Sequence, residues 1–565
     1  MSVSVASSIA LSALRAAQVG LSVSSANIAN ADVDGYTVKT ANQVSTVSGS
    51  SGSGTAIASI TGGVDKYVFA SLIGANADLG AASVTASYTD QLQALMGSTT
   101  GSDDGGTSIA TQMAALETAV TELASTPDDN ATQSSFVSAA DSLASQLRDI
   151  STSISTLETN AGQQIADDVD AVNEALAKIA KLNDQIVAAK AKGQSTADLE
   201  DERNAAITSI SSLLDITTTT TSSGAVYVKT TGGTTLLSSK LHALSVGAGG
   251  AILVDGSNNI TSTLTNGEIG GLLTLRDETL PAAQAELDAL AAKLISAVNA
   301  AVADGSAVPA PDSLTGTTDV SSLSSFSATG TVRIALVDDD GNLTSYTDLD
   351  LSSYSSIDDL ISALDAIDGV SASLNTDGTL SIVSDTDGSG VAIGALDGSI
   401  DGQSFSSFFG FNAVFTGSSA SNIKVSSSLL ADSGTLAVGT LSTNKTSGTV
   451  LTSGSTLVAN ALNSALTTSY SYASTGSIGS MKGTLTAYAS RIVAAFATRA
   501  SSAENALTRT EALQASIANT VSSKSGVNID EETARLQDYQ TLYSAAAQVI
   551  RIAREMFERL LAAVG

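Results

Sequence analysis

Apolar residues near the N-terminus recur with helical spacing. They fall three and four positions apart, which places them on one narrow stripe of a helix. The stripe consists of Leu11, Leu14, Gln18, Leu21, Ser25 and Ile28. The segment ANADVDGY follows it at 29–36 and is rich in residues that favour turns. We therefore predict a helix that ends in a turn.

The C-terminal segment carries the most regular pattern in the sequence, a seven-residue apolar repeat. Its members are Ile529, Leu536, Tyr539, Tyr543, Ala546, Ile550, Ala553, Phe557 and Leu560. Such a repeat is typical of a helix in a coiled coil. A helix from Asp530 to Leu560 would be about 45 Å long, too long to pack only on a small domain.

Both terminal stripes must be covered, because apolar area left in water is unfavourable. The stripes can cover each other, or neighbouring subunits can cover them. Polymerisation is the more economical use of two apolar ends in one long chain. We therefore assign the large apolar residues of both stripes to an assembly interface, namely Leu11, Leu14, Leu21, Ile28, Ile529, Leu536, Tyr539, Tyr543, Ile550, Phe557 and Leu560.

Helical spacing also dominates the region behind the N-terminal segment. One short helix is predicted from Met113 to Leu123, and two longer helices over 136–157 and 165–186, with a break at Gly193. The preceding stretch, 45–63, is rich in Ser and Gly and predicts a flexible link or short strands. The pattern as a whole is that of a helical bundle.

The middle of the chain changes to β-branched alternation. A small sheet is predicted from Ile216, with Gly232 and Gly233 as a hairpin turn. A long helix follows over about 270–304. Residues 315–455 contain short strand-like runs separated by Asp-Gly turns, with one helix near 357–367.

These elements predict a multidomain α + β fold. It combines terminal coiled-coil helices, a helical bundle domain and inserted β-rich outer domains. The predicted segments are 1–45 (assembly helix and turn), 46–104 (linker and first helical segment), 105–215 (bundle), 216–269 (small β segment), 270–305 (long helix returning to the bundle), 306–455 (β-rich domain), 456–524 (helical segment returning to the bundle) and 525–565 (coiled-coil helix).

Composition and charge narrow the classes of function. The chain has 565 residues and a net charge of −31, which repels nucleic acid and anionic membranes. It has no cysteine, which excludes disulfides and zinc-thiolate sites. Arg15 interrupts the apolar N-terminal run, so we predict no cleaved signal peptide. The sequence has no run of about 18 consecutive apolar residues, so we also predict no membrane-spanning helix.

Candidate sites for chemistry are few, and each has a simpler interpretation. His242 is the only histidine and has no evident catalytic partner in the sequence, so we interpret it as a surface or strand residue. The acidic loops at 338–342 and 385–388 could bind calcium, but an Asp-Gly turn between strands explains them better. The glycine cluster at 247–250 is interpreted as a loop. We predict no enzyme, metal site or cofactor.

Both ends of the chain carry distinctive short segments. They are Ser25-Ala26-Asn27-Ile28-Ala29-Asn30-Ala31 with Gly35-Tyr36, and Ser525-Gly526-Val527-Asn528-Ile529-Asp530-Glu531-Glu532 with Leu536, Tyr539-Gln540, Tyr543, Ala545-Ala546, Val549-Ile550 and Met556-Phe557. These segments resemble the terminal signatures of flagellar rod, hook and hook-associated proteins. The chain departs from the usual pattern at Ala26, where members have Asn, and at Val33 and Asp34, where they have Thr-Pro.

Three interior stretches are similar to the hook-associated protein 1 family in particular. They are LNDQI at 182–186, GGLLTLRDE with Leu280-Pro281 at 270–281, and FFGFN with Phe415-Thr416-Gly417 at 408–417. The resemblance implies an extracellular subunit of the bacterial flagellum that forms a ring at the junction between hook and filament. Its implied partners are further copies of itself, the hook protein, hook-associated protein 3 and a cytoplasmic export chaperone at the C-terminal region. It implies type III export without signal cleavage.

The leading hypothesis is therefore a structural junction subunit that self-assembles through its terminal helices. Two alternatives stay open. The acidic, Ser- and Thr-rich β segment alone would fit a secreted adhesin or surface-layer protein, and the terminal signatures alone would fit another flagellar axial protein of the hook or rod.

Overall fold

The computed structural model describes residues 3–33, 35–48, 51–97, 108–323 and 326–564. Asp34 of the predicted turn lies outside the described residues. The chain divides into two compact units, and helices α2, α4 and α12 contribute residues to both. Unit 1 is Met1–Tyr88, Thr159–Asp277 and Ser501–Gly565, and unit 2 is Thr89–Glu158 and Glu278–Ala500. The predicted multidomain α + β class is confirmed, and the finer division into eight segments stays a prediction.

Unit 1 is built mainly from helices, with a β-hairpin and two three-stranded sheets. Its elements, including the helices shared with unit 2, are α1 (Val3–Ala29), β1 (Lys39–Ser48), β2 (Ser51–Gly62), α2 (Lys66–Leu95), α4 (Asn130–Ala191), α5 (Ala197–Leu213), β3 (Ile216–Thr220), β4 (Val226–Thr230), β5 (Thr235–Leu237), β6 (Leu244–Val246), β7 (Ile252–Val254), β8 (Asn258–Asn259), α6 (Gly267–Thr274), α12 (Leu485–Ser525) and α13 (Ile529–Val564).

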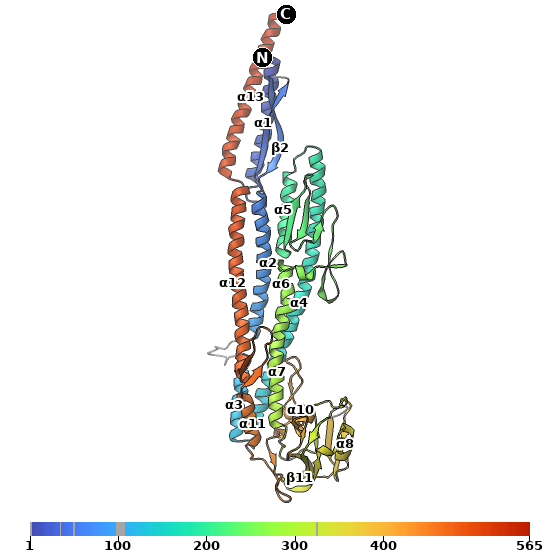
Figure 1. The fold of residues 1–565 in the computed structure, drawn as a ribbon. Coiled ribbons are helices and arrows are strands. Elements are labelled where there is room, and N and C mark those ends of the chain that lie inside the picture. Colours follow the sequence, from blue (N-terminus) through green and yellow to red (C-terminus); the bar gives the residue numbers. More distant parts are fainter. Residues whose placement is uncertain (1–2, 34, 49–50, 98–107, 324–325, 565) are drawn as a thin grey trace. The chain divides into compact units, whose positions relative to one another are not determined.

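The two ends of the chain meet in unit 1. Helices α1 and α13 pack side by side and run antiparallel, with both termini at the same end (Figure 1). The hairpin β1–β2 packs on α1 and also contacts α5. The link or short strands predicted for 45–63 are therefore part of a hairpin whose strands have 10 and 12 residues.

One prediction for the bundle is wrong. The two helices predicted over 136–157 and 165–186 form a single helix, α4, of 62 residues. The apolar steps continue without a gap through Leu157, Ala161 and Ile165, all buried. Gly162 costs only about 1 kcal/mol in a helix, so it weakens α4 locally without ending it. The break predicted at Gly193 is confirmed, because α4 ends just before it and Gly193 has a φ of +69°.

The β segment of unit 1 follows the sequence pattern closely. Strands β3, β4 and β5 form one antiparallel sheet, and Gly233 turns the chain between β4 and β5 with a φ of +89°. Strands β6, β7 and β8 form a second sheet, with the predicted glycine loop at 247–250 between its first two strands. The predicted hairpin turn and the predicted loop are both confirmed.

The long helix predicted over 270–304 contains a feature that the pattern missed. Helix α6 passes into one π-helical turn over Leu275–Thr279, and α7 continues from there. Pro281 lies in the first turn of α7, where its missing N–H is tolerated. Periodicity alone does not predict this turn, because one extra residue changes the apolar spacing only locally.

Unit 2 combines the ends of three long helices with many short strands. Its own elements are α3 (Ile109–Ser125), α7 (Leu280–Val302), β9 (Ser313–Thr315), β10 (Ala328–Thr329), β11 (Thr331–Asp338), β12 (Leu343–Asp350), α8 (Ile357–Asp365), β13 (Val370–Leu374), β14 (Leu380–Ser384), β15 (Ser389–Ala395), β16 (Ser399–Ile400), β17 (Gln403–Ser404), α9 (Phe405–Phe409), β18 (Phe415–Thr416), β19 (Lys424–Val425), α10 (Ser427–Ala431), β20 (Thr440–Leu441), β21 (Leu451–Thr452), α11 (Leu457–Thr467), β22 (Tyr470–Tyr472) and β23 (Met481–Gly483).

The predicted β-rich segment of unit 2 has its own core. The sheet β12–β11–β15 and helix α8 bury a cluster of Val, Leu and Ile side chains. Phe405, Phe408, Phe409 and Phe411 join this cluster, with ring centroids 5.0 to 6.2 Å apart. The predicted helix near 357–367 is α8, while the short helices α9 and α10 were not predicted.

A buried ion pair stabilises the helical part of unit 2. Glu286 on α7 is fully buried, and both of its carboxylate oxygens accept hydrogen bonds from the guanidinium of Arg499 on α12. The backbone N–H of Ser477 also donates to Glu286 Oε1, over 2.7 Å. The carboxylate is therefore satisfied from two elements that lie far apart in the sequence.

Candidate functional site

The contact between α1 and α13 includes a close approach at a small residue of α1, Gly20. Because small side chains let two helix backbones approach closely, the aromatic ring of Tyr539 fits against the backbone at Gly20. A Cβ atom at Gly20 would lie 2.5 to 2.7 Å from three atoms of that ring. The buried residues of α1 are Ala10, Ala16, Ala17, Gly20, Ser24 and Asn27.

The predicted stripe of α1 is not the surface that faces α13 within one chain. It lies one residue further along, which turns it by about 100° around the helix. Leu11 is 42% exposed, Gln18 and Ser25 are exposed, and the other members are partly exposed. The other members are Leu14, Leu21 and Ile28.

The predicted repeat of α13 is divided between the contact and the solvent. Ala546 and Ala553 are buried, while Leu536, Tyr539 and Ile550 are partly exposed. The remaining members are exposed by 39 to 62%. They are Ile529, Tyr543, Phe557 and Leu560. The structure thus brings Tyr539 onto α1, whereas Tyr543 in the middle of the repeat and the members at its two ends stay exposed.

A second apolar stripe on α13 was missed in the sequence. Its large members are Leu542, Val549, Ile552 and Met556, each 45 to 56% exposed. The spacing of 542, 545, 549, 552 and 556 is also helical, and the more regular heptad concealed it. A helix that is apolar on two faces requires cover on both.

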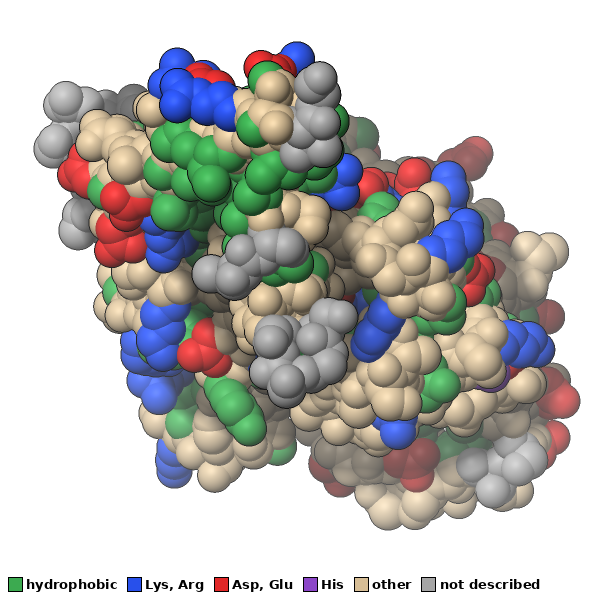
Figure 2. All heavy atoms as spheres, turned by 90° about the horizontal axis from the view of Figure 1, so that it is seen from above, with side chains coloured by type: hydrophobic (Ala, Val, Ile, Leu, Met, Phe, Trp, Pro, Cys, Tyr) green, Lys and Arg blue, Asp and Glu red, His purple; other side chains and the backbone are tan. Residues whose placement is uncertain are grey.

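We call the large exposed side chains of α13 the open face. It consists of Leu542, Tyr543, Val549, Ile552, Met556, Phe557, Leu560 and Leu561. Figure 2 looks at the molecule from the end where Figure 1 marks both termini, and hydrophobic side chains gather on that surface. Large contiguous apolar patches on a protein surface mark sites of association.

The N-terminal signature has a structural role at the end of α1. Asn27 is fully buried, and its side-chain amide pairs with the backbone of Lys39. Its Nδ2 donates to Lys39 O over 2.9 Å, and Lys39 N donates to its Oδ1 over 3.0 Å. The hydroxyl of Tyr36 donates to the same Oδ1 over 2.9 Å. Asn27 therefore fixes the turn after α1 and the start of β1.

A buried charge pair attaches the hairpin to α5. The ammonium group of Lys39 pairs with Asp201 and donates to the backbone O of Ala197 over 3.0 Å. Asp201 also accepts from the backbone N–H and the hydroxyl of Thr37, over 3.0 and 2.7 Å. Burial, with smaller effects from the charges of Asp198 and Asp201, raises the pKa of Tyr36 to about 12.

The C-terminal signature forms the turn between α12 and α13. Ser525 O accepts from the backbone N–H of Val38 over 2.8 Å, which ties this turn to the N-terminal segment. Asn528 Oδ1 accepts from the backbone N–H of Asp530 over 3.1 Å and caps α13. Both signatures therefore hold the α1–α13 pair at its base.

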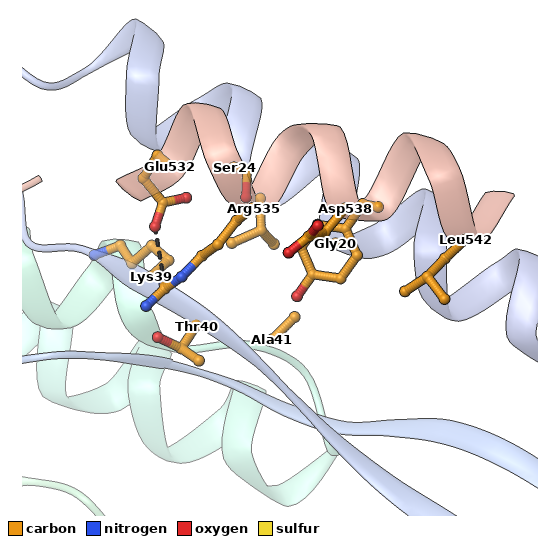
Figure 3. A pocket seen from close by; sticks show the side chains of 11 residues that line it. Gly20, Ser24, Lys39, Thr40, Ala41, Glu532, Arg535, Asp538 and Leu542 are labelled. Atoms are coloured by element: carbon orange, nitrogen blue, oxygen red, sulfur yellow. Dashed lines mark hydrogen bonds and ion pairs between the residues drawn. The ribbon is translucent and has the colours of Figure 1, made fainter. Parts of the chain in front are cut away.

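A pocket of about 300 Å³ lies between α1, β1 and α13 (Figure 3). Glu532 lines it and is only 2% exposed. Its Oε1 accepts from Arg535 over 2.9 Å, whereas its Oε2 is buried without a hydrogen-bond partner among the described residues. The remaining lining residues are Gly20, Val23, Ser24, Lys39, Thr40, Ala41, Asp538, Tyr539 and Leu542.

The single histidine has a partner that the sequence did not indicate. Nδ1 of His242 lies 2.6 Å from Oδ2 of Asp255, which is 13 residues further along the chain. Asp255 is exposed, and its pKa is lowered by the hydrogen bond to His242. The prediction of a surface or strand histidine fits its position beside the short strands of unit 1.

The acidic loops in unit 2 are turns, as predicted. Asp338 Oδ1 accepts from the backbone N–H groups of Asp340 and Asn342, over 3.1 and 2.7 Å. Asp385 accepts from the hydroxyl of Ser371 over 2.7 Å. Across the described ranges, no three His, Cys, Asp or Glu side chains gather closely enough to hold a metal ion.

Two helices have the length and composition of a candidate membrane span. They are α1 and α2, each with a mean hydropathy of 1.2 over the relevant window. Helices of this composition also occur inside proteins, where other elements cover them. The prediction against membrane insertion stays a prediction.

Comparison with protein families finds three matches along the chain. Residues 90–312 match the family model of the flagellar hook-associated protein FlgK helical domain. Residues 8–37 match that of the flagella basal body rod protein. Residues 519–563 match that of the flagellar basal body rod FlgEFG protein C-terminal region. The two terminal matches cover most of α1 and α13.

Curated relatives are similar over about half of the chain. Flagellar hook-associated protein 1 of Escherichia coli K12 is 24% identical over 309 residues, covering 51% of this chain and 55% of the relative. The protein of the same name from Salmonella typhimurium is 24% identical over 310 residues, covering 52% and 55%. The match thus spans about half the length of these relatives.

A solved structure has a similar fold. The flagellar hook junction protein FlgK from Burkholderia pseudomallei superposes with a TM-score of 0.52 at 18% identity. The superposition covers 80% of this chain and 99% of that one.

Proposed function

Since the chain belongs to the flagellar hook-associated protein 1 family, we propose that it is a structural subunit at the junction between hook and filament. In this role it self-assembles through α1 and α13. The exposed members of the predicted interface on both helices and the open face then lie between subunits. A role in a flagellar structure is what the relatives' names describe.

The observation that supports assembly most directly is the open face of α13. Its eight large side chains are 39 to 62% exposed. Burying the rest of each side chain would contribute about 1 kcal/mol, and the whole face about 5 to 10 kcal/mol. A contact of that size stabilises a subunit in an assembly, whereas in the free chain the same area is unfavourable in water.

The proposal includes specific partners and a route of export. The partners are further copies in a ring, the hook protein on one side and hook-associated protein 3 on the other. A cytoplasmic chaperone covers the C-terminal region before export, which suits an apolar helix that would otherwise associate too early. The chain then leaves the cell through the flagellar type III apparatus without signal cleavage.

A second candidate is another axial subunit of the rod or hook. It is favoured by the terminal matches, because both are to rod-type families. The match of the helical domain at 90–312 favours the junction. A secreted adhesin would not explain the open face, because an adhesin subunit does not require a polymerising helix. An enzymatic role has no supporting feature, so its absence stays a prediction.

The experiment compares exposed apolar positions inside and outside the interface. In a bacterium that makes this protein, Ile552→Ser and Phe557→Ser should each greatly reduce incorporation into flagella, because both side chains belong to the open face. Leu457→Ser is the matched control, since Leu457 is 69% exposed on α11 in unit 2. Normal incorporation of both α13 variants, measured by antibody on isolated flagella, would contradict the proposal.

A further inference from the structure

The pocket between α1, β1 and α13 lacks a donor for a buried carboxylate. Glu532 Oε2 has no hydrogen-bond partner within the described part of the chain, although its residue is 2% exposed. Leaving a buried charged acceptor unpaired costs about 1 to 3 kcal/mol or more. Such a group in a pocket indicates that something outside the chain supplies the missing donor.

The charges around the pocket favour a cation. The ammonium group of Lys39 is already paired with Asp201, on the side of α5. Arg535 is paired with Glu532 Oε1. Asp538 also lines the pocket and makes no ion pair with any residue that the structure describes. An incoming cation therefore meets Glu532 Oε2 and Asp538 as acceptors (Figure 3), and Tyr539 also lines the pocket.

The chain itself offers suitable cations at the far end of α13. Outside the pocket, every basic residue of α1 and α13 is an arginine: Arg15, Arg551, Arg554 and Arg559. Three of these lie in the last turns of α13, together with Glu555 and Glu558, whereas its first turns carry Asp530, Glu531, Glu532 and Asp538 beside Arg535. The last turns therefore carry a small net positive charge and the first turns a net negative charge, which suits contact between copies.

These arginines are free to change partners. Arg554 bonds to Glu558 over 3.0 Å, and Arg551 bonds to Gln548 over 2.7 Å. Both bonds lie on an exposed helix surface, where such pairs contribute about 1 kcal/mol or less. A guanidinium has five N–H donors and can reach two carboxylates at once.

We infer that this pocket receives the guanidinium of an arginine from the last turns of α13 in a second copy of the chain. The inference rests on the proposed self-assembly and names its point of contact. Within one chain the contact is impossible, because residues 551–559 lie at least about 13 Å along α13 beyond the last pocket residue, Leu542.

The absence of cysteine makes a direct test available. Thr40 lines the pocket, and Glu555 lies on the same side of α13 as Arg551 and Arg559, four residues from each. Residue 555 is about 20 Å along the helix from the pocket, so a disulfide between cysteines introduced at positions 40 and 555 must join two chains. In isolated flagella, the T40C/E555C double variant should give dimers and higher oligomers on oxidation. T40C/S516C, with its second cysteine on α12, should not.

Two further variants test the charge. Glu532→Gln preserves shape but turns an N–H donor toward the incoming donor, so it should reduce the cross-linked fraction about tenfold. Glu531→Gln, at the exposed neighbouring position, should leave it unchanged. Protein present in flagella without cross-links, or equal cross-linking in both Gln variants, would overturn the inference while leaving the proposed function intact. If the cysteine variants fail to assemble, the Glu532→Gln and Glu531→Gln variants are compared without them. Equal incorporation of these two variants into flagella would then also overturn the inference. Absence of the unmodified protein from flagella would overturn the proposed function itself.

Discussion

The contact between Gly20 and Tyr539 allows a test in which one substitution has opposite effects in two backgrounds. In the native chain, Gly20→Ala places a Cβ atom 2.5 to 2.7 Å from three ring atoms of Tyr539. Carbon atoms in contact prefer about 3.5 to 4.0 Å, so the helices must separate or the ring must move by roughly 1 Å. Overpacking of this kind costs about 1 to 3 kcal/mol.

The same substitution also has a favourable effect. Alanine is better than glycine in a helix by about 1 kcal/mol. The net effect in the native chain is therefore a destabilisation of about 0 to 2 kcal/mol. When Tyr539 is first changed to Ala, the collision disappears and only the gain remains. Gly20→Ala should then stabilise the Tyr539→Ala chain by about 1 kcal/mol.

Amide hydrogen exchange along α1 measures this effect where it occurs. Protection of residues 10–27 should fall in Gly20→Ala and should rise when the same change is added to Tyr539→Ala. Ser22→Ala, at an exposed position of α1, serves as the matched control and should behave alike in both backgrounds. If Gly20→Ala changed protection by the same amount in both backgrounds, the close packing of these two residues would be refuted.

Three further predictions concern buried polar groups. Asn27→Ala removes the bonds to Lys39 and Tyr36 and should destabilise the base of the hairpin by about 2 to 3 kcal/mol, measured by thermal unfolding against the partly exposed Asn30→Ala. Burial, with a smaller effect from the charge of Glu268, raises the pKa of Asp168 to about 7. The folded chain therefore holds this proton more tightly than the unfolded chain, so its stability should fall as pH rises from about 4 to about 7. Because Asp168 is partly exposed, Asp168→Asn should stabilise the chain at pH 8 by only about 1 to 2 kcal/mol, with no gain at pH 3.5. Arg499→Met leaves the buried Glu286 carboxylate without its cation and should cost about 3 to 5 kcal/mol, whereas Arg499→Met with Glu286→Leu should cost much less.

The sequence predicted helices well where an apolar stripe faces the core of the same unit. Leu143, Leu147 and Ile150 are all buried on α4, as their spacing requires. The pattern nevertheless predicted one helix to end at Leu157 and another to begin at Ile165, whereas α4 continues through both. Gly162 lies between them, and a single glycine weakens a helix less than tertiary packing stabilises it.

The terminal pair was harder to predict because its contact does not use large side chains. The stripe of Leu11, Leu14 and Leu21 is the obvious apolar feature of α1, yet the ring of Tyr539 on α13 packs against Gly20. Small residues signal contact only when the position of the partner is known, and that information is absent from local periodicity. The leucines that stay exposed are compatible with a further contact outside the chain.

Polar contacts between distant segments were also beyond the reach of the pattern. Lys39 and Asp201 are separated by 162 residues, and Glu286 and Arg499 by 213. Spacing along the chain does not indicate that these charges meet, because only the fold brings them together. The residues of both terminal signatures were identified by resemblance, and the structure supplies their physical role in the turns that hold the α1–α13 pair.

Immunogold labelling of isolated flagella tests the central proposal most directly. With an epitope inserted at the exposed 444–447 turn of unit 2, electron microscopy should show one narrow band of gold where the hook meets the filament. Label along the whole hook or filament, or spread evenly over the cell surface, would contradict the account of a junction subunit.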